Sequence, residues 1–181
     1  MQFSFPIWLM VAIYGVWLRN ENISKIEVLQ RKCVCIMTFA PYDSHSNEIF
    51  MELGLLKVRD LISLNQLKLV YDFHNSHLPP DLMSLFQLSC DVHTTHRKLN
   101  STVNNLLYIP RARTTTYGLQ SIRYQCPKLW NEVFKKGFIQ VDNDKKSIIK
   151  ISDIRSKKGF NNVLKKYFLH SYTIEPEVIF Y

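Results

Sequence analysis

The chain has 181 residues, of which 46% are hydrophobic and 21% charged, and this balance excludes a wholly disordered protein. Five glycines and seven prolines are too few for a collagen-like or linker-dominated architecture. The net charge of +8 is uneven, because residues 1–91 carry seven Lys/Arg and nine Asp/Glu whereas residues 92–181 carry sixteen and six. This asymmetry is expected of a C-terminal half that faces a polyanion, and a merely solvated basic surface is the alternative.

Residues 3–18 form an apolar stretch at the N-terminus that contains Ser4, Pro6 and Gly15. A membrane-spanning helix needs about 20 residues, and this stretch has neither a preceding basic region nor a clear cleavage pattern after it. We therefore expect a buried helix or strand, with a membrane segment or a signal-like sequence as alternatives. Such a start also fits a chain whose natural N-terminal neighbour is missing.

The four cysteines are too few and too scattered for a disulfide scaffold, and they indicate a reduced intracellular compartment, nucleus or cytoplasm. Cys33 and Cys35 lie two positions apart on a predicted helix and are therefore expected on different faces.

The first predicted helix begins at Ser24, where the sequence Ser-Lys-Ile-Glu forms a capping box with Glu27. The apolar residues that follow recur every three or four positions and form one stripe, the pattern of an amphipathic helix. That stripe consists of Ile26, Leu29, Cys33, Ile36, Met37 and Ala40. Pro41 is expected to end the helix, because proline lacks the amide hydrogen that a helix needs.

Three further helices are expected before the middle of the chain. A short one covers residues 47–53 and ends with Gly54 as its C′ residue. A longer one covers residues 58–75, and its wide apolar surface predicts packing on two sides. After a Pro-Pro pair, Asp81 is expected to cap a short helix that runs to Leu88.

The helical periodicity is lost over residues 90–123, where the short apolar run 106–109 is a candidate strand. A helix is predicted over residues 121–133 with Pro127 at its start, and a last amphipathic helix ends near His170. The predicted fold is mainly α, a small helical assembly with an irregular basic segment and a C-terminal amphipathic helix. Its parts are a helical region (1–88), a basic, aromatic-interleaved irregular segment (89–131) and a basic linker with the C-terminal helix (132–181).

Signals of catalysis are largely missing from the sequence, which has no P-loop, GxGxxG, GxSxG or HExxH motif. Asp142 and Asp144 are interpreted as a solvated turn rather than a metal site, and His74 and His77 as a packing and capping pair. One possible zinc set lacks the usual second pair of ligands: Cys90, His93, His96 and Cys126. We therefore predict no catalytic residue, no metal ligand, no cofactor and no small-molecule substrate.

The stretch 92–131 contains six basic residues and no acid, with tyrosines and a tryptophan interleaved. Lys and Arg neutralise phosphates, and aromatic faces stack on unpaired bases, so this pattern indicates contact with RNA or DNA. The candidate binding residues are Arg97, Lys98, Arg111, Arg113, Arg123 and Lys128. For Leu129 and Trp130 we expect a place in the core instead.

An ordered series of short segments carries a family resemblance. The series is YGVW (14–17), IEVLQRK (26–32), LGLLKVRDL (53–61), YDFHN (71–75), LPP (78–80), SIRYQCPKLWN (121–131) and LKKYFL (164–169). It resembles the region that follows the polymerase core in LINE-type (non-LTR) retrotransposon reverse transcriptases of jockey-like and related groups. The likeness covers about residues 10–170.

The resemblance implies that this chain corresponds to the thumb and tail, which hold template and primer, with residues 1–88 as the thumb-like part. The family's metal-binding aspartates lie upstream, so the chain is expected to be a C-terminal fragment of an RNA-directed DNA polymerase without activity of its own. Its partners would be RNA or DNA and the missing polymerase core. The alternatives are an inert or partner-dependent structural remnant of a degenerate element and, more weakly, a small membrane-attached basic protein held by residues 3–18.

Two departures from the family pattern suggest relaxed constraint. Cys126 stands where the family usually has glycine before the Pro-x-x-Trp-Asn run, and a backbone position that requires glycine would be strained by cysteine. Residues 132–134 (EVF) replace the usual turn with proline.

Overall fold

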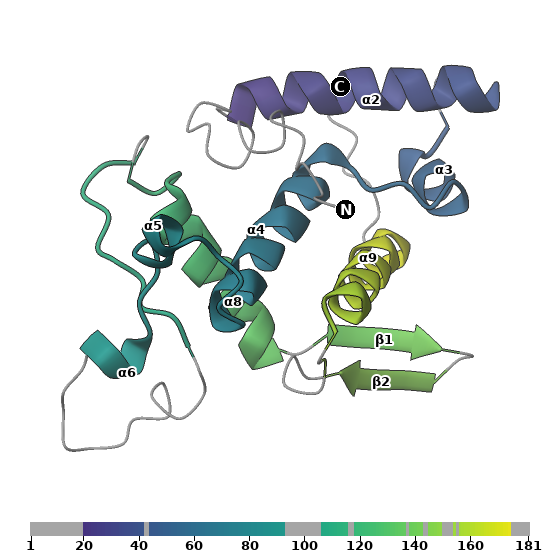
Figure 1. The fold of residues 1–181 in the computed structure, drawn as a ribbon. Coiled ribbons are helices and arrows are strands. Elements are labelled where there is room, and N and C mark those ends of the chain that lie inside the picture. Colours follow the sequence, from purple (N-terminus) through teal and green to yellow (C-terminus); the bar gives the residue numbers. More distant parts are fainter. Residues whose placement is uncertain are drawn as a thin grey trace. The chain divides into compact units, whose positions relative to one another are not determined.

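The computed structural model is mainly helical, which confirms the predicted fold class (Figure 1). It describes residues 20–41, 44–92, 106–115, 118–136, 138–142, 145–149, 154 and 156–174, and for residues 20, 21, 136, 138–142, 145–149 and 174 the backbone alone. The helices are α2 (Asn20–Thr38), α3 (Ser46–Glu52), α4 (Val58–His74), α5 (Pro80–Met83), α6 (Ser89–Val92), α8 (Ile122–Lys136) and α9 (Lys157–Ile174). The strands are β1 (Phe138–Asp142) and β2 (Lys145–Ile149).

None of the helices in the described ranges is long and apolar enough to cross a membrane. The apolar stretch 3–18 lies outside the described residues.

The described residues form two compact units. Each unit contains segments from more than one of the predicted parts 1–88, 89–131 and 132–181. The first unit comes from Asn65–Gly137 and the second from Trp17–Leu64 together with Phe138–Tyr181. One boundary therefore falls within α4, and the other separates α8 from the β-hairpin.

In the second unit, α9 lies against α3 and β1 (Figure 1). Its buried face consists of Phe160, Leu164, Phe168 and Tyr172, which recur every four positions on one side of the helix. The amphipathic C-terminal helix is confirmed, and it extends one turn past His170 to Ile174.

A polar cluster around Tyr172 joins α9 to the first turn of α4 and to Lys57, which precedes it. The Tyr172 hydroxyl donates to the Asp60 carboxylate and accepts from the Lys57 backbone N–H (2.9 Å). The Lys57 ammonium lies 5.2 Å from the centre of the Tyr172 ring and also donates to the Asn47 side chain. Burial raises the pKa of Asp60, and the hydrogen bond from Tyr172 opposes that rise.

Helix α2 is attached to its unit through polar side chains. The Gln30 amide donates to the Leu56 carbonyl (2.9 Å) and accepts from the Val58 N–H (3.0 Å), while Arg31 donates to the Ser44 carbonyl (3.2 Å). Val58 is the first residue of α4, where an N–H has no partner within its own helix. Gln30 therefore caps α4 from a different helix.

The apolar stripe of α2 faces solvent. The side chains that α2 buries are Ile23, Val34 and Cys35, whereas Ile26, Leu29, Cys33, Ile36 and Met37 are exposed. An apolar stripe of this kind ordinarily packs against a core, so its exposure to solvent could not be predicted from the apolar period alone. Cys33 and Cys35 do occupy different faces, as expected.

In the first unit, α4 is buried on more than one side from Asn65 onward, as its wide apolar surface predicts. Phe73 meets the buried Phe86 edge to face, with ring centres 5.5 Å apart. Trp130 of α8 and Leu107 are also buried. These side chains form the core of the first unit, and two of them, Leu107 and Trp130, belong to the basic segment.

Three helices end with a residue of positive φ, which are Phe39 (54°), Gly54 (59°) and Ser76 (55°). At each end the following residue's N–H donates to a carbonyl five positions earlier, over distances of 2.8 to 3.1 Å. This is the Schellman arrangement, in which glycine is the usual C′ residue because it has no Cβ. The prediction of Gly54 as a C′ residue is confirmed, whereas the other two ends use side-chain-bearing residues.

Two predicted caps are wrong. Helix α2 begins at Asn20, so Ser24 lies inside the helix, and Glu27 instead pairs with Arg59 (3.2 Å). Asp81 does not cap a helix to Leu88, because α5 starts after Pro79 and ends at Met83 without a side-chain cap.

The basic linker contains a hairpin that the sequence analysis did not predict. Strands β1 and β2 pair antiparallel from Phe138 with Ile149 to Asp142 with Lys145. The available signal is a two-residue Asn-Asp connection between short runs with β-branched residues such as Ile139, Val141 and Ile148, and the basic composition concealed it. Asp142 thus ends β1, next to the hairpin connection, and Asp144 lies outside the described residues.

We expect Phe39→Gly to stabilise the protein by about 0.5–1 kcal/mol, because a side chain in the left-handed region is strained and glycine is not. Phe39 is 95% exposed, so its removal costs little packing. Urea denaturation of the two proteins measures the difference. Gly54→Ala is the matched control and should destabilise, because it introduces the same strain at φ 59°. A Phe39→Gly protein no more stable than the original would contradict the expectation.

Candidate nucleic-acid interface

Within the basic segment, the stretch 107–114 is anchored to α8 by Asn131. Its side-chain oxygen accepts from the Leu107 N–H (2.9 Å), and its side-chain nitrogen donates to the Leu107 carbonyl (2.8 Å). Leu107 is buried, and buried backbone groups need such partners. One side chain therefore satisfies both backbone groups at the start of the segment.

A single β-bridge adds to this anchor. Leu88 and Leu107 pair antiparallel, with Ser89 N–H donating to the Leu106 carbonyl (2.9 Å) and Tyr108 N–H to the Gln87 carbonyl (2.8 Å). The candidate strand at 106–109 is thus an isolated bridge rather than a strand.

The far end of the segment is closed by a turn at Thr114. The Gly118 N–H donates to the Thr114 hydroxyl (2.9 Å), and the Leu119 N–H donates to the Thr114 carbonyl (3.1 Å). A Cβ on Gly118 would lie 2.7 Å from that carbonyl oxygen, so only glycine fits. Ser121 then starts α8, its carbonyl accepting from the Tyr124 and Gln125 amides.

Between these two anchors, Arg111 and Arg113 project from the surface. Both are exposed, and with Ala112 they line a hollow of about 540 Å³. Two guanidinium groups two positions apart at one hollow can each donate paired hydrogen bonds to a phosphate. The structure thus brings together two of the six predicted binding residues.

The other predicted residues are spread out. Arg123 and Lys128 are both exposed on α8, but a spacing of five positions turns them about 140° apart around the helix. Arg97 and Lys98 lie outside the described residues.

The sequence analysis missed Lys135, which is exposed and lies two turns after Lys128 on the same face of α8. The seven-residue spacing of these two lysines was the signal available. Glu132 lies between them on that face and reduces its positive charge.

The aromatic residues of this unit contribute unequally to the surface. Trp130 is 2% exposed and stacks on His74, with ring centres 4.9 Å apart and planes 26° apart. It is therefore a core residue, as expected, and is not available to stack on bases. Tyr108 and Tyr124 are half-buried, while Tyr117 lies outside the described residues.

His74 and His77 are the packing and capping pair that the sequence suggested. Burial lowers the pKa of His74, because a charged imidazole is poorly solvated against Trp130. His77 is exposed, and its backbone N–H closes the end of α4 on the Asp72 carbonyl (2.8 Å).

Cys126 is not strained, which corrects the expectation from the family pattern. It lies within α8 with its side chain fully buried, and the described non-glycine residues with positive φ do not include it. Pro127 is likewise inside α8 rather than at its start. Because proline has no N–H, the Arg123 carbonyl lacks the helical hydrogen bond from the residue four positions later. The helix continues through residues 132–134 to Lys136.

Metal chemistry has no support in the described ranges, where no group of three His, Cys, Asp or Glu residues could hold an ion. Burial raises the pKa of the Cys126 thiol to about 12, and this side chain is fully buried within α8. Cys90 is exposed, and His93 and His96 lie outside the described residues.

Comparisons of the chain with protein-family models, with curated proteins and with solved structures found no match. A proposal for the function of the chain therefore depends on its own residues.

We expect stability to fall with pH below about 6.5, the ordinary pKa of histidine, in part because His74 protonates more readily in the unfolded chain. The lowered pKa means that the unfolded state binds more protons in this range, so folding is favoured above it and loses this contribution as pH falls towards the folded pKa. Denaturation of wild type and His74→Phe at pH 7.5 and 5.5 measures the effect.

The His74→Phe protein keeps an aromatic ring against Trp130 but cannot titrate, so its loss of stability between the two pH values should be smaller. An equal loss in wild type and His74→Phe would show that His74 does not contribute.

Proposed function

We propose that this chain is the C-terminal part of a LINE-type RNA-directed DNA polymerase and that it binds RNA or DNA without catalysing a reaction itself. The ordered series of segments from YGVW to LKKYFL supports the relationship. The paired arginines at the hollow of the basic segment carry the binding proposal.

The physical case for binding starts from Arg111 and Arg113. Both side chains extend from a segment that is held at Leu107 and at Thr114, so part of the cost of ordering the backbone is already met. No acidic residue occurs between positions 92 and 131. A phosphate that approaches this hollow therefore meets two guanidinium groups without a competing carboxylate from the same stretch.

Binding of this kind is to the phosphate backbone. Trp130 is buried, so the described residues offer half-buried tyrosines rather than an exposed tryptophan for base stacking. We therefore assign the segment a sequence-independent role, the electrostatic holding of a nucleic acid strand. A site in the nucleus or cytoplasm, where such strands occur, is part of the same proposal.

The relationship to a polymerase has a direct test in the nucleic acid that encodes the chain. An in-frame region upstream of Met1 that encodes a polymerase palm with paired aspartates would support it. Unrelated sequence or stop codons at that place would contradict it.

Binding should weaken and become less salt-dependent in the double variant Arg111→Ala plus Arg113→Ala. Each phosphate contact contributes about 0.7–0.9 to the slope of log affinity against log salt, so the loss of two should reduce the slope by about 1.4–1.8. Fluorescence anisotropy with a labelled single-stranded RNA and with a DNA duplex of equal length, each over a salt series, measures both quantities.

The matched control is Lys25→Ala plus Lys32→Ala, which removes the same charge from exposed positions of α2 in the other unit. This variant should keep the wild-type slope. Equal loss in both double variants would indicate a general charge effect, and absent or salt-independent binding by the wild-type chain would end the binding proposal.

A partner-dependent structural remnant is the second candidate, and the exposed apolar side of α2 favours it. Exposed apolar residues that lie together on one side of a helix mark an interaction site. Under the polymerase relationship, the missing core is the partner. A chain that remains a monodisperse monomer and unfolds cooperatively at every concentration would contradict this candidate.

A further inference from the structure

Residues 109–113 leave their peptide groups open to a ligand. Within the described ranges, no hydrogen bond joins a backbone N–H or C=O group of these residues to another group of the protein. The backbone on either side is held, at Leu107 by Asn131 and at Thr114 by the turn to Gly118. The stretch between these anchors therefore offers both donors and acceptors at a defined place on the surface.

The exposure of these residues alternates, which is typical of an extended backbone. Ile109, Arg111 and Arg113 are exposed, whereas Pro110 and Ala112 are half-buried. Pro110 also restricts the residue before it to extended conformations. Arg111 and Arg113 therefore share the outer side of the stretch, about 7 Å apart along the backbone. Consecutive phosphates of a nucleic acid strand have a similar separation.

The hollow of about 540 Å³ is bordered by guanidinium groups and by peptide groups alike. Its lining residues, Arg111, Ala112 and Arg113, are consecutive, so the peptide groups that join them lie beside it. The Ala112 side chain faces the turn, because a Cβ placed on Gly118 would lie 3.1 Å from the Ala112 Cβ. A group of the size of a nucleobase fits a hollow of this volume.

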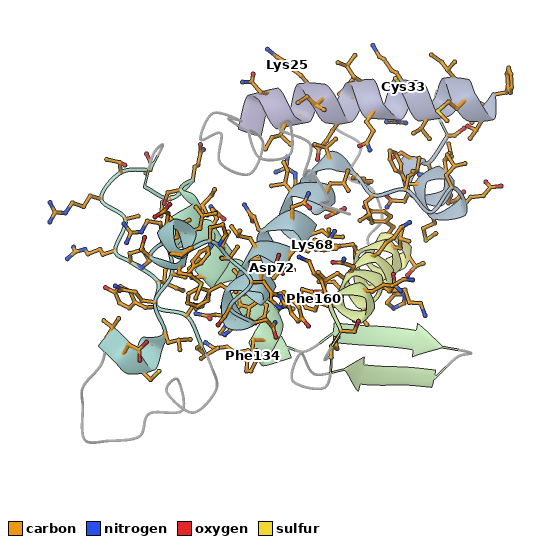
Figure 2. The ribbon with its side chains drawn as sticks, viewed as in Figure 1. Lys25, Cys33, Lys68, Asp72, Phe134 and Phe160 are labelled. Carbon is orange, nitrogen blue, oxygen red and sulfur yellow. The ribbon has the colours of Figure 1, made fainter. Side chains whose placement is uncertain are left out.

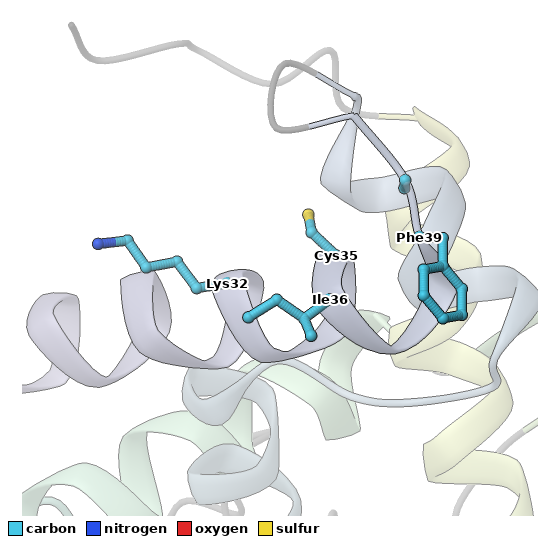
Figure 3. Close-up of a pocket in the computed structure, with 5 residues that line it drawn as sticks. Lys32, Cys35, Ile36 and Phe39 are labelled. Carbon is cyan, nitrogen blue, oxygen red and sulfur yellow. The ribbon is translucent and has the colours of Figure 1, made fainter.

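A hollow in the other unit shows the contrast. It has a volume of about 560 Å³ and is lined by Lys32, Cys35, Ile36, Phe39 and Ala40 (Figure 3). Apart from Lys32 its lining side chains are uncharged, and most of these residues belong to α2, where backbone groups bond one another. Of these two hollows, the one at Arg111 is the one that places paired cations beside open peptide groups.

Open carbonyl groups require a ligand that can donate. Phosphate oxygens accept hydrogen bonds from guanidinium and N–H groups but have no hydrogen to give to a carbonyl. The edge of each nucleic acid base has both donors and acceptors, and in a duplex the opposite base occupies its Watson–Crick edge. An unpaired strand therefore matches the whole set of groups at residues 109–113, whereas a duplex matches mainly the two arginines.

An extended acidic peptide is another ligand with donors, acceptors and negative charge. Regular pairing with such a peptide uses an uninterrupted row of N–H donors, and Pro110 removes one of them. The contacts of a nucleic acid strand do not require that regularity. The observations therefore favour the unpaired strand.

We propose that residues 109–113 bind a single strand of RNA or DNA, with Arg111 and Arg113 on consecutive phosphates and the peptide groups between them on the edges of unpaired bases. This inference rests on the proposed nucleic-acid binding and adds the unpaired strand as its ligand. Every base offers both kinds of hydrogen-bonding group, so the contact is independent of sequence.

Fluorescence anisotropy of the full chain with three labelled DNA ligands of equal length tests the proposal. The ligands are a single strand, its duplex, and a strand of abasic sites that keeps the phosphates. The single strand should bind about tenfold more tightly than the abasic strand, the factor expected of two net hydrogen bonds. It should also bind more tightly than the duplex, although the higher charge density of the duplex favours the opposite order.

The outcomes separate this inference from the proposed function. Equal binding of the intact and abasic strands, or tighter binding of the duplex, would overturn the inference and leave nucleic-acid binding in place. Absence of binding to all three ligands would end both. Displacement of the strand by polyglutamate as effectively as by unlabelled strand, at equal charge, would indicate an acidic peptide as ligand and overturn the inference.

The variant Ala112→Pro removes one N–H from the hollow while keeping both arginines and an extended backbone. Its affinity for the intact single strand should fall by about twofold to tenfold, whereas its affinity for the abasic strand should not change. Lys25→Ala plus Lys32→Ala is the control and should keep the wild-type preference, since Figure 2 shows Lys25 pointing away from α2 in the other unit. Equal loss on both strands in Ala112→Pro would overturn the proposal.

Discussion

Two side-chain amides hold the described backbone in place, one in each compact unit. Gln30 bonds the Leu56 carbonyl and the Val58 N–H, and Asn131 bonds both backbone groups of Leu107. Each amide can donate and accept at once, which suits a backbone that has left a regular helix or sheet. A buried backbone group without such a partner costs about 1–3 kcal/mol.

Tertiary contacts also decide what each unit presents to solvent. Helix α2 buries Ile23, Val34 and Cys35, and most of its apolar stripe is exposed. Because Asn131 fixes Leu107, the segment that follows leaves the core with Arg111 and Arg113 at its surface. The two candidate interaction surfaces, one apolar and one basic, thus both depend on tertiary contacts.

The helices were predictable because their signals are local. The apolar period placed α4 and α9 within a few residues, and Gly54 marked the end of α3 because glycine alone adopts positive φ without strain. Signals that depend on competition between neighbours were less reliable. Ser24 matched a capping box, yet α2 starts before it, and Glu27 pairs with Arg59 from a distant part of the chain.

The residue types of the candidate site could be predicted from the sequence, but the spatial arrangement of those residues could not. A run of basic residues without acids is visible in the sequence, but the spacing of Arg123 and Lys128 on one helix separates them, and Trp130 is taken into the core by His74. Lys135 joins the face of Lys128 because α8 continues past the expected end. Cys126 was expected to be strained, and the helix gives it an ordinary place in the core.

Local sequence therefore determined the helical class, the bounds of α3 and α4 and the surplus of positive charge in the C-terminal half, since each depends on residues within a few positions of one another. Tertiary structure alone decided which side of α2 is covered, which arginines share a hollow and which aromatic residues are buried. The physical reason is that these outcomes depend on hydrogen bonds and packing between residues 24 to 56 positions apart, such as Asn131 with Leu107 and His74 with Trp130. An amphipathic period indicates that a helix has an apolar side, but only the tertiary contacts of the helix determine the direction in which that side faces.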